Sequence, residues 1–401
     1  MLRHSDFSAY FIGSTVSNLG TWLANTTQAI LAYNLTHSAF TVGLIVCFQF
    51  TPVLMVGPLA GGLVARTGNL RSLLVATQLV SAIVAGGLAV LDASGHLGVA
   101  GLAVGALVMG TAYCFALPAF SILVPALVPP GESRAALAMN SVSYNIGRTA
   151  APALAVLIIT WRGFAPAFAL NAVSFLALAA VLAKTQLRNA IPRQEGRPRI
   201  TDGFRAAKRN RIWLLLLMVA AVTITADPIL VLGPTLAHQL HLPTGWAGFF
   251  LSALGAGTIF GSLLPVPSPE RLRSAAYPLA LLGLSVLIFS LGWDRWVCLG
   301  AAVLAGIACL LTGAVTQTLL LEFSGPNRAV VMAVWAIAWA GTKPLASLID
   351  GLLATVFNVH IAGAVLALPA LLPALFLMAV GREGQRIIPP EWKTHLFSTP
   401  M

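Results

Sequence analysis

Long apolar runs recur along the whole chain, and each run ends in a short polar or Gly/Pro-rich stretch. A helix needs about 20 apolar residues to cross the hydrocarbon core of a bilayer, so runs of this size are typical of membrane spans. Hydrophobic residues make up 58% of the chain and charged residues only 9%, whereas an ordinary soluble domain carries roughly 25% charged residues. The sequence therefore predicts an all-α protein whose main solvent is lipid.

The apolar runs predict twelve transmembrane helices. The first run is too long, and too polar at Ser17, Asn18 and Asn25, for a cleaved secretory signal, so we expect it to remain as the first span. The predicted spans are 7–32, 39–63, 70–91, 98–123, 136–159, 163–183, 212–236, 246–266, 274–292, 296–321, 329–356 and 359–381.

The basic residues orient these spans. If both termini are cytoplasmic, inside segments hold 19 of the 23 Lys and Arg residues, and outside segments hold only Arg162 and Arg295. Cytoplasmic loops of membrane proteins carry such an excess, so we expect a bacterial inner-membrane protein with both termini in the cytoplasm. The net charge of +11 is spread between spans and forms no contiguous basic patch, so nucleic acid is not an expected partner.

One long Arg-rich connection, residues 184–211, divides the spans six and six. We predict an N-terminal bundle at 1–183, a cytoplasmic basic linker at 184–211, and a C-terminal bundle with a short tail at 212–401. The halves also echo each other weakly, since the segment from Arg134 can be laid over that from Arg328. Repeated halves are typical of secondary transporters, whose substrate sites lie at the repeat interface near mid-membrane.

Polar residues follow single faces of several spans. In the first span they are spaced by 4, 3, 4 and 3 residues, which places them on one side of a helix. Such a face avoids lipid, either because it lines a cavity or because it makes hydrogen bonds between helices. The residues concerned are Ser14, Asn18, Thr21, Asn25 and Gln28 in the first span, Ser141, Asn145 and Arg148 in the fifth, and Trp335, Trp339, Lys343, Ser347 and Asp350 in the eleventh.

Four charges lie away from the ends of the predicted spans: Arg148, Asp227, Lys343 and Asp350. A charge at mid-helix costs about 2.5 to 3.5 kcal/mol on insertion scales, so it usually has a partner, a cavity or a function. A carboxyl group in low dielectric tends to stay protonated, which suits a group that takes up and releases protons. Asp227 and Asp350 are therefore our proton-coupling candidates. The alternative is a structural pair, either Asp227 with Lys343 or Asp350 with Arg148.

The chain lacks the usual signatures of enzymes and metal sites. It has no Walker loop, no HExxH or GxSxG motif, and its four cysteines lie in apolar runs without a CxxC pattern. His238 and His241 are three residues apart, but we interpret them as a solvated loop pair. We therefore expect no enzyme activity, no cofactor and no metal, and an ion gradient, of protons in our interpretation, as the source of energy.

Three segments carry a family resemblance: LRHSDFSAYFIGSTVSNLGTWLANTTQA at 2–29, LPAFSILVPALVPPGESRAALAMNSVSYNIGRTAAPALA at 117–155 and NRAVVMAVWAIAWAGTKPLASLIDGLLA at 327–354. They resemble the opening, the fourth-to-fifth-span signature and the eleventh span of the major facilitator superfamily, in the branch of enterobactin-type siderophore exporters and macrolide and multidrug efflux proteins. The resemblance implies two pseudo-symmetric six-helix bundles that rock about a central cavity.

Two motifs depart from the family pattern. The loop after the second span, GGLVARTGNLR, keeps the cytoplasmic gate residues Gly61, Arg66, Gly68 and Arg71, but Ala65 stands where the family has an acidic residue. The resemblance then implies a weaker cytoplasmic latch or a substitute contact. In the fifth span AAPALA keeps Pro152 with alanines in place of glycines, which weakens the likeness to antiporters.

These observations favour proton-coupled export of a medium-sized organic compound, such as a drug, siderophore or secondary metabolite, by a monomer in the bilayer. There are two alternatives. The first is uptake of a nutrient or siderophore, and the second is a role as a membrane sensor or assembly protein that transports nothing. Arg148 and Lys343 favour anionic cargo. The candidate cavity residues are Asn18, Asn25, Gln28, Gln49, Tyr113, Tyr144, Arg148, Trp335, Trp339 and Lys343.

Overall fold

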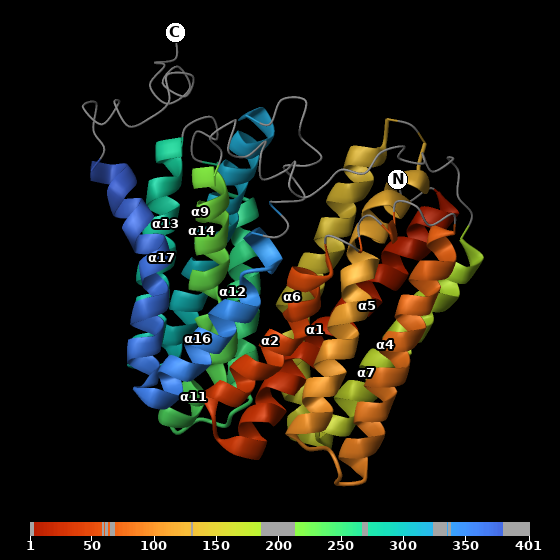
Figure 1. Cartoon of the computed structure of the whole chain (residues 1–401), viewed down its shortest axis with the longest axis horizontal. Coiled ribbons are helices and arrows are strands. Elements are labelled where there is room, and N and C mark those ends of the chain that lie inside the picture. The colour runs from red at the N-terminus through yellow and green to blue at the C-terminus, as the bar shows by residue number, and fades with distance from the viewer. Residues whose placement is uncertain are drawn as a thin grey trace.

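A computed structural model describes residues 4–57, 60, 63–64, 69–129, 131–185, 213–266, 272–323, 335 and 338–379. Within these ranges the chain folds into helices and contains no β-strand (Figure 1). Seven helices are long and apolar enough to cross a membrane, and three shorter apolar helices lie among them. The predicted all-α membrane fold is confirmed.

The N-terminal half consists of six helices in the described part of the chain. They pack together mainly through α1 with α6 and α7, α4 with α5 and α7, and α2 with α5. Their bounds are α1 Ser5–Thr36, α2 Ala39–Met55, α4 Leu70–Ala93, α5 Val99–Ala126, α6 Ser133–Arg162 and α7 Phe164–Lys184.

In the described part of the chain, the C-terminal half contains eight α-helices. Its helices are α9 Trp213–Ala226, α10 Pro228–Val231, α11 Gly233–Gln239, α12 Trp246–Ser262, α13 Ala276–Leu291, α14 Arg295–Phe323, α16 Lys343–Val356 and α17 Val359–Ala379, with a short 3₁₀ turn at Leu272–Ala275. Of the predicted linker at 184–211, Lys184 ends α7 and Thr185 follows it, while residues 186–211 lie outside the described residues, so the linker and the domain boundaries stay a prediction.

The seventh predicted span is divided into three helical segments, and the residues at the two junctions keep helical backbone dihedral angles. It forms α9, α10 and α11, with junctions at Asp227 and Leu232. Pro228 and Pro234 each lack a backbone N–H and begin or nearly begin the next helix, which is where proline is tolerated. As a result Asp227 lies at a helix junction.

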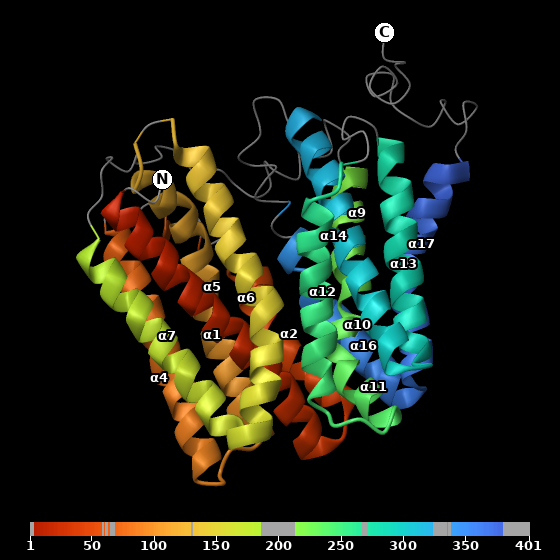
Figure 2. The ribbon, with the colours of Figure 1, turned by 180° about the vertical axis from the view of Figure 1, so that it is seen from behind.

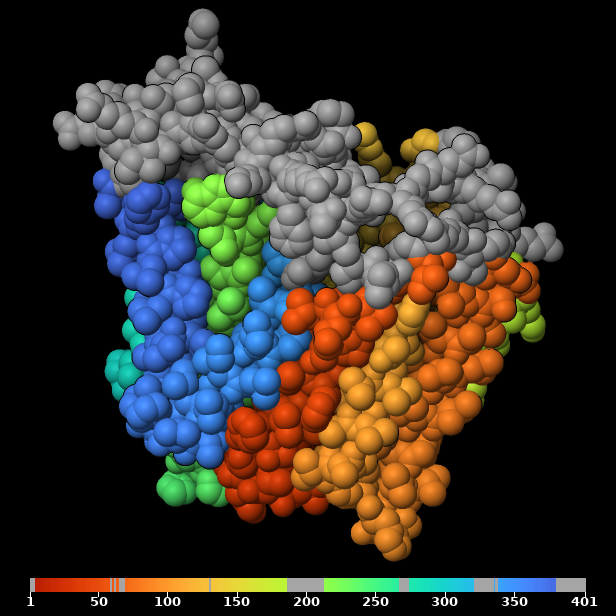
Figure 3. Space-filling model, viewed as in Figure 1, coloured from red at the N-terminus to blue at the C-terminus, as the bar shows by residue number. Residues whose placement is uncertain are grey.

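The two halves stand side by side, with α2 facing α16 and α6 facing α12 (Figures 1 and 2). We call the end of the bundle where α1 begins and α17 ends the near end, and the opposite end the far end. The halves approach each other at the far end and diverge toward the near end in both views. Figure 3 shows the side chains of α2 and α16 in contact over the far part of this face.

Glycines allow the halves to touch backbone to backbone near the far end. A β-carbon on Gly43 of α2 would overlap the carbonyl oxygen of Ser347 in α16, and one on Gly248 of α12 would lie 2.6 Å from the carbonyl oxygen of Pro152 in α6. Real β-carbons do not approach other atoms this closely, so glycine is required at both places. These contacts close the seam between the halves at the far end.

Candidate functional site

Arg148 lies on α6 beside the seam and is partly exposed. Its Cζ atom is 5.9 Å from the ring centroid of Trp22 on α1, and the Trp22 ring packs edge-on against Tyr144 at 5.7 Å. A guanidinium over an indole face gains a cation–π attraction. The buried Nε atom has no hydrogen-bond partner among the described residues. Part of the donor capacity of Arg148 therefore remains free.

Lys343 begins α16 in the other half. Its Nζ atom lies 4.6 Å from the ring centroid of Phe50 on α2, so this cation–π contact crosses the seam. Lys343 also interacts electrostatically with Asp227 and Arg148. The two cations thus belong to one electrostatic group, with one cation supplied by each half.

Asp227 and Asp350 are the two acidic members of the same group. Asp227 is 4% exposed at the junction of α9 and α10, and Asp350 is 0% exposed in α16. Neither carboxyl oxygen of Asp350, nor Oδ2 of Asp227, has a hydrogen-bond partner among the described residues. The two carboxyl groups interact electrostatically with each other.

The ion pairs that the sequence offered as an alternative, Asp227 with Lys343 and Asp350 with Arg148, do not form at contact distance. Among the described residues, no carboxylate oxygen lies within 4.0 Å of the Arg148 or Lys343 side-chain nitrogens, and the ion pair found is His4 with Glu132. Asp227 and Lys343 act on each other only at longer range. The four charges therefore lie together without neutralising one another in salt bridges.

The predicted amide side chains fall into two groups: three make hydrogen bonds between helices, and one has an oxygen without a partner among the described residues. Asn18 donates to the Ser143 hydroxyl at 2.9 Å, and Gln49 donates to the side-chain oxygen Oδ1 of Asn25 at 2.8 Å, so both contacts join helices of the N-terminal half. Gln28 is buried, and its Oε1 atom has no partner among the described residues. The polar face of α1 thus contacts α2 and α6, partly through interhelical hydrogen bonds.

The predicted aromatic residues lie on both sides of the seam. Tyr113 on α5 and Tyr144 on α6 are each 37% exposed. The rings of Trp335 and Trp339 stack at 5.8 Å and 15°. The structure therefore brings Tyr144 close to Arg148, while the tryptophan pair precedes Lys343 along the chain.

The cytoplasmic gate motif is mostly outside the described residues. Gly61, Arg66 and Gly68 fall there, and Arg71 is an exposed residue in the first turn of α4. The role predicted for this motif stays a prediction.

Two aromatic residues of the site were missed by sequence reasoning. Trp22 lies four residues after Asn18 and three before Asn25, so the polar face of the first span already contained a signal for it. Phe50 carries no comparable signal, because its partner Lys343 lies in the other half of the chain. It emerges only when the halves are placed side by side.

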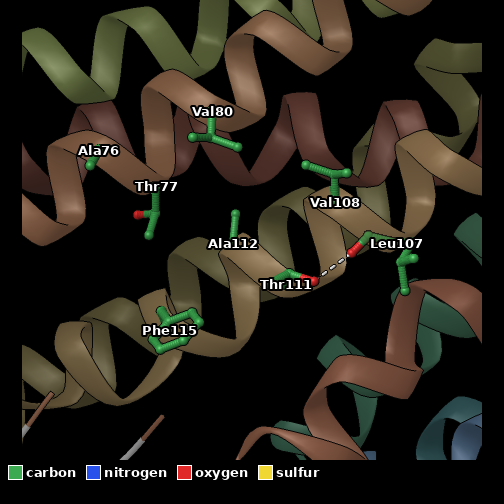
Figure 4. A pocket seen from close by; sticks show the side chains of 8 residues that line it. All are labelled: Ala76, Thr77, Val80, Leu107, Val108, Thr111, Ala112 and Phe115. Atoms are coloured by element: carbon green, nitrogen blue, oxygen red, sulfur yellow. Dashed lines mark hydrogen bonds between the residues drawn. The ribbon is translucent and has the colours of Figure 1, made fainter. Parts of the chain in front are cut away.

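A separate groove of about 360 Å³ lies between α4 and α5 (Figure 4). Its walls are almost entirely apolar, and the Thr111 hydroxyl, its nearest polar group on α5, donates to the carbonyl oxygen of Leu107 at 2.8 Å. The groove contains none of the predicted site residues. Its lining residues are Ala76, Thr77, Val80, Leu107, Val108, Thr111, Ala112 and Phe115.

The fold and the known proteins it matches define a multi-pass membrane transporter of the major facilitator superfamily, and not an enzyme. A family model named MFS_3, described as transmembrane secretion effector, matches residues 1–393, so the chain belongs to that family. No curated protein sequence matches the chain.

Solved transporter structures share the fold at low sequence identity. A variant of the nucleoside transporter NupG is 13% identical, with 94% of this chain and 100% of that chain covered and a TM-score of 0.75. A POT family transporter in complex with 5-aminolevulinic acid is 12% identical, with 94% and 96% covered and a TM-score of 0.71. A bacterial homologue of the human lysosomal transporter Spinster, inward-facing and unoccupied, is 13% identical, with 93% and 95% covered and a TM-score of 0.66.

Proposed function

We propose that this transporter exports a medium-sized organic compound with an anionic or acidic group, in exchange for protons and by alternating access. The cargo classes are those of the resembled branch, namely siderophores, drugs and secondary metabolites. The observation that carries the proposal is the group of four unpaired charges shared between the halves, Arg148, Asp227, Lys343 and Asp350.

The two cations support an anionic cargo. Arg148 and Lys343 come from opposite halves and interact as like charges, with no carboxylate in contact distance among the described residues. An anion between them would receive charge-assisted hydrogen bonds and relieve their repulsion. Aromatic rings beside each cation, Trp22 and Phe50, add flat apolar surface for the organic part of the cargo.

The two buried carboxyl groups support proton coupling. A charge without a partner in low dielectric is costly, so binding or release of one proton at Asp350 or Asp227 changes the energy of its surroundings strongly. Asp227 lies at the junction between α9 and α10, and the Thr223 hydroxyl one turn earlier is 2.9 Å from that of Thr342, next to Lys343. A proton at Asp227 can therefore influence both the seventh span and the position of the Lys343 cation.

The arrangement of the halves supports alternating access. Their close backbone contacts lie toward the far end, and the helices diverge toward the near end (Figures 1 and 2). With the near end cytoplasmic, as the basic residues predict, this state would accept cargo from the cytoplasm. The secretion description of the matched family supports export over uptake.

Purified protein in proteoliposomes with an imposed pH gradient tests the proposal. A panel of siderophores, aromatic carboxylates and lipophilic cations of matched size would be offered, with an internal pH dye reporting proton movement. We expect the acidic compounds to move against their gradient with proton counterflow. We also expect Asp227→Asn and Asp350→Asn to lose this coupling, while Asp294→Asn, an exposed far-end control, keeps it.

Three outcomes would contradict parts of the proposal. Cargo movement that ignores the pH gradient and survives both substitutions would remove proton coupling. Equal transport of the anions and the cations would remove the charge preference. Protons moving in the same direction as the cargo would contradict exchange and indicate cotransport, the coupling that an uptake permease would use.

A further inference from the structure

Three aromatic rings meet where the halves join at the far end. Tyr33 and His37 belong to the end of α1, and His238 belongs to α11 in the other half. The ring centroids of His37 and His238 are 6.0 Å apart, and Tyr33 lies 5.8 Å from His37 and 6.1 Å from His238. Both imidazoles are exposed, so water at the far end reaches this cross-half contact.

Hydrogen bonds beside the rings also cross between the halves. The Thr244 hydroxyl donates to the side-chain oxygen Oδ1 of Asn34 at 2.9 Å, and the backbone N–H of Phe40 donates to the Thr355 hydroxyl at 3.2 Å. The histidine pair therefore belongs to the set of contacts that holds the far end closed.

The helices packed around the pair supply no carboxylate to balance a positive charge. The helices packed around it, α2, α10, α11 and α12, carry no Asp, Glu, Lys or Arg within their bounds. The other titratable or charged groups of this region are Tyr33, His241, His360, Asp294 and Arg295. The Nδ1 atom of His360 is 2.6 Å from the Ser290 carbonyl oxygen, the Asp294 carboxylate accepts from the backbone N–H of Trp296 at 2.8 Å, and Arg295 packs on Trp246.

We propose that His37 and His238 form a proton-binding latch at the far end, distinct from the buried carboxyl groups. This inference rests on the proposed proton-coupled alternating access. Protons from the far side would charge both imidazoles while their rings are in contact. The like charges then repel α1 from α11 and favour opening of the far end, whereas the neutral rings keep it closed.

Distance measurements between spin labels test the latch without any cargo. Labels at Ser94→Cys and Phe357→Cys, both exposed far-end positions in opposite halves, report the separation of the halves in the full-length chain. The four native cysteines are buried, and the chain without added cysteines measures any background labelling. On lowering the pH from about 7.5 to about 5.5, across the range in which histidine changes charge, the open population should rise about fivefold.

Substitutions separate the latch from the transport mechanism. The double variant with His37→Gln and His238→Gln should lose the pH response, and its far end should stay closed. The double variant with His37→Lys and His238→Lys should have an open far end at neutral pH. His96→Gln, an exposed histidine outside the ring cluster, should respond like the native chain. Asp350→Asn should keep the pH response even where it loses coupled transport. An unchanged response in the double Gln variant, or no response in the native chain, would overturn the latch.

Discussion

The Nζ atom of Lys343 lies 4.6 Å from the ring centroid of Phe50, and this contact joins the two halves of the transporter. A cation–π contact of this kind is worth about 0.5 to 2 kcal/mol, enough to position the ammonium group but not to neutralise it. The Lys343 charge therefore remains available to an anion while the ring holds it at the seam.

Loss of the Lys343 charge should weaken anionic cargo selectively. In Lys343→Gln, we expect the half-saturating concentration of an anionic compound to rise about tenfold, since a charge-assisted hydrogen bond worth roughly 1.5 to 3 kcal/mol is lost. Neutral compounds should be little affected. Lys184→Gln, at the exposed end of α7, is the matched control. An equal loss for neutral and anionic compounds would argue for a structural role of Lys343.

Gly43 should be essential for closing the far end. A β-carbon there would overlap the carbonyl oxygen of Ser347, so Gly43→Ala should destabilise this packing by about 1 to 3 kcal/mol and lower the Tm measured in detergent by a few degrees. Gly87→Ala is the control, because nothing lies within 4 Å of a β-carbon at that position. A Tm of Gly43→Ala at or above that of Gly87→Ala would contradict the close contact.

The hydrogen bond between Asn18 and Ser143 should couple α1 to α6. A double-mutant cycle with Asn18→Ala and Ser143→Ala is expected to give a coupling free energy of about 0.6 kcal/mol, the usual size for such bonds between membrane helices. Unfolding by denaturing detergent supplies the four free energies. Additive effects of the two substitutions would show that the bond contributes nothing to stability.

Gln28 should affect transport more than stability. Its Oε1 atom is buried without a partner among the described residues, so Gln28→Leu removes an unsatisfied group and should leave the Tm unchanged or raised. If Gln28 contacts cargo, as predicted from its place on the polar face of α1, the same variant should transport several-fold more slowly. A lower Tm with normal transport would mean that Gln28 is a structural residue.

The sequence predicted the spans and the in-membrane charges because lipid imposes strong constraints on both. A run of apolar residues, or an Arg such as Arg148 within one, is readable without knowing its neighbours. The spacing of Asn18 and Asn25 likewise predicted a shared face, and the structure places both in interhelical hydrogen bonds.

Contacts between the halves were not predictable in the same way. The pairing of Phe50 with Lys343, and of His37 with His238, depends on how two independent bundles meet, which no local pattern encodes. The division of the seventh span had a local cause in Pro228, but the sequence did not show that Asp227 would lie at a helix junction.

Arg148 and Lys343, the partly exposed cations of the charged group, must meet water between the halves to bind an anionic cargo, and thiol labelling tests this most directly. Tyr144→Cys and Ile83→Cys replace residues that are 37% and 74% exposed, respectively, the first beside Trp22 and the second on α4. A charged, membrane-impermeant maleimide reaches cysteines in water far faster than cysteines in lipid. Added at the near end, it should modify Tyr144→Cys rapidly and leave Ile83→Cys unmodified. Equal inertness of both cysteines would contradict a wet chamber at the seam, and with it the proposed site.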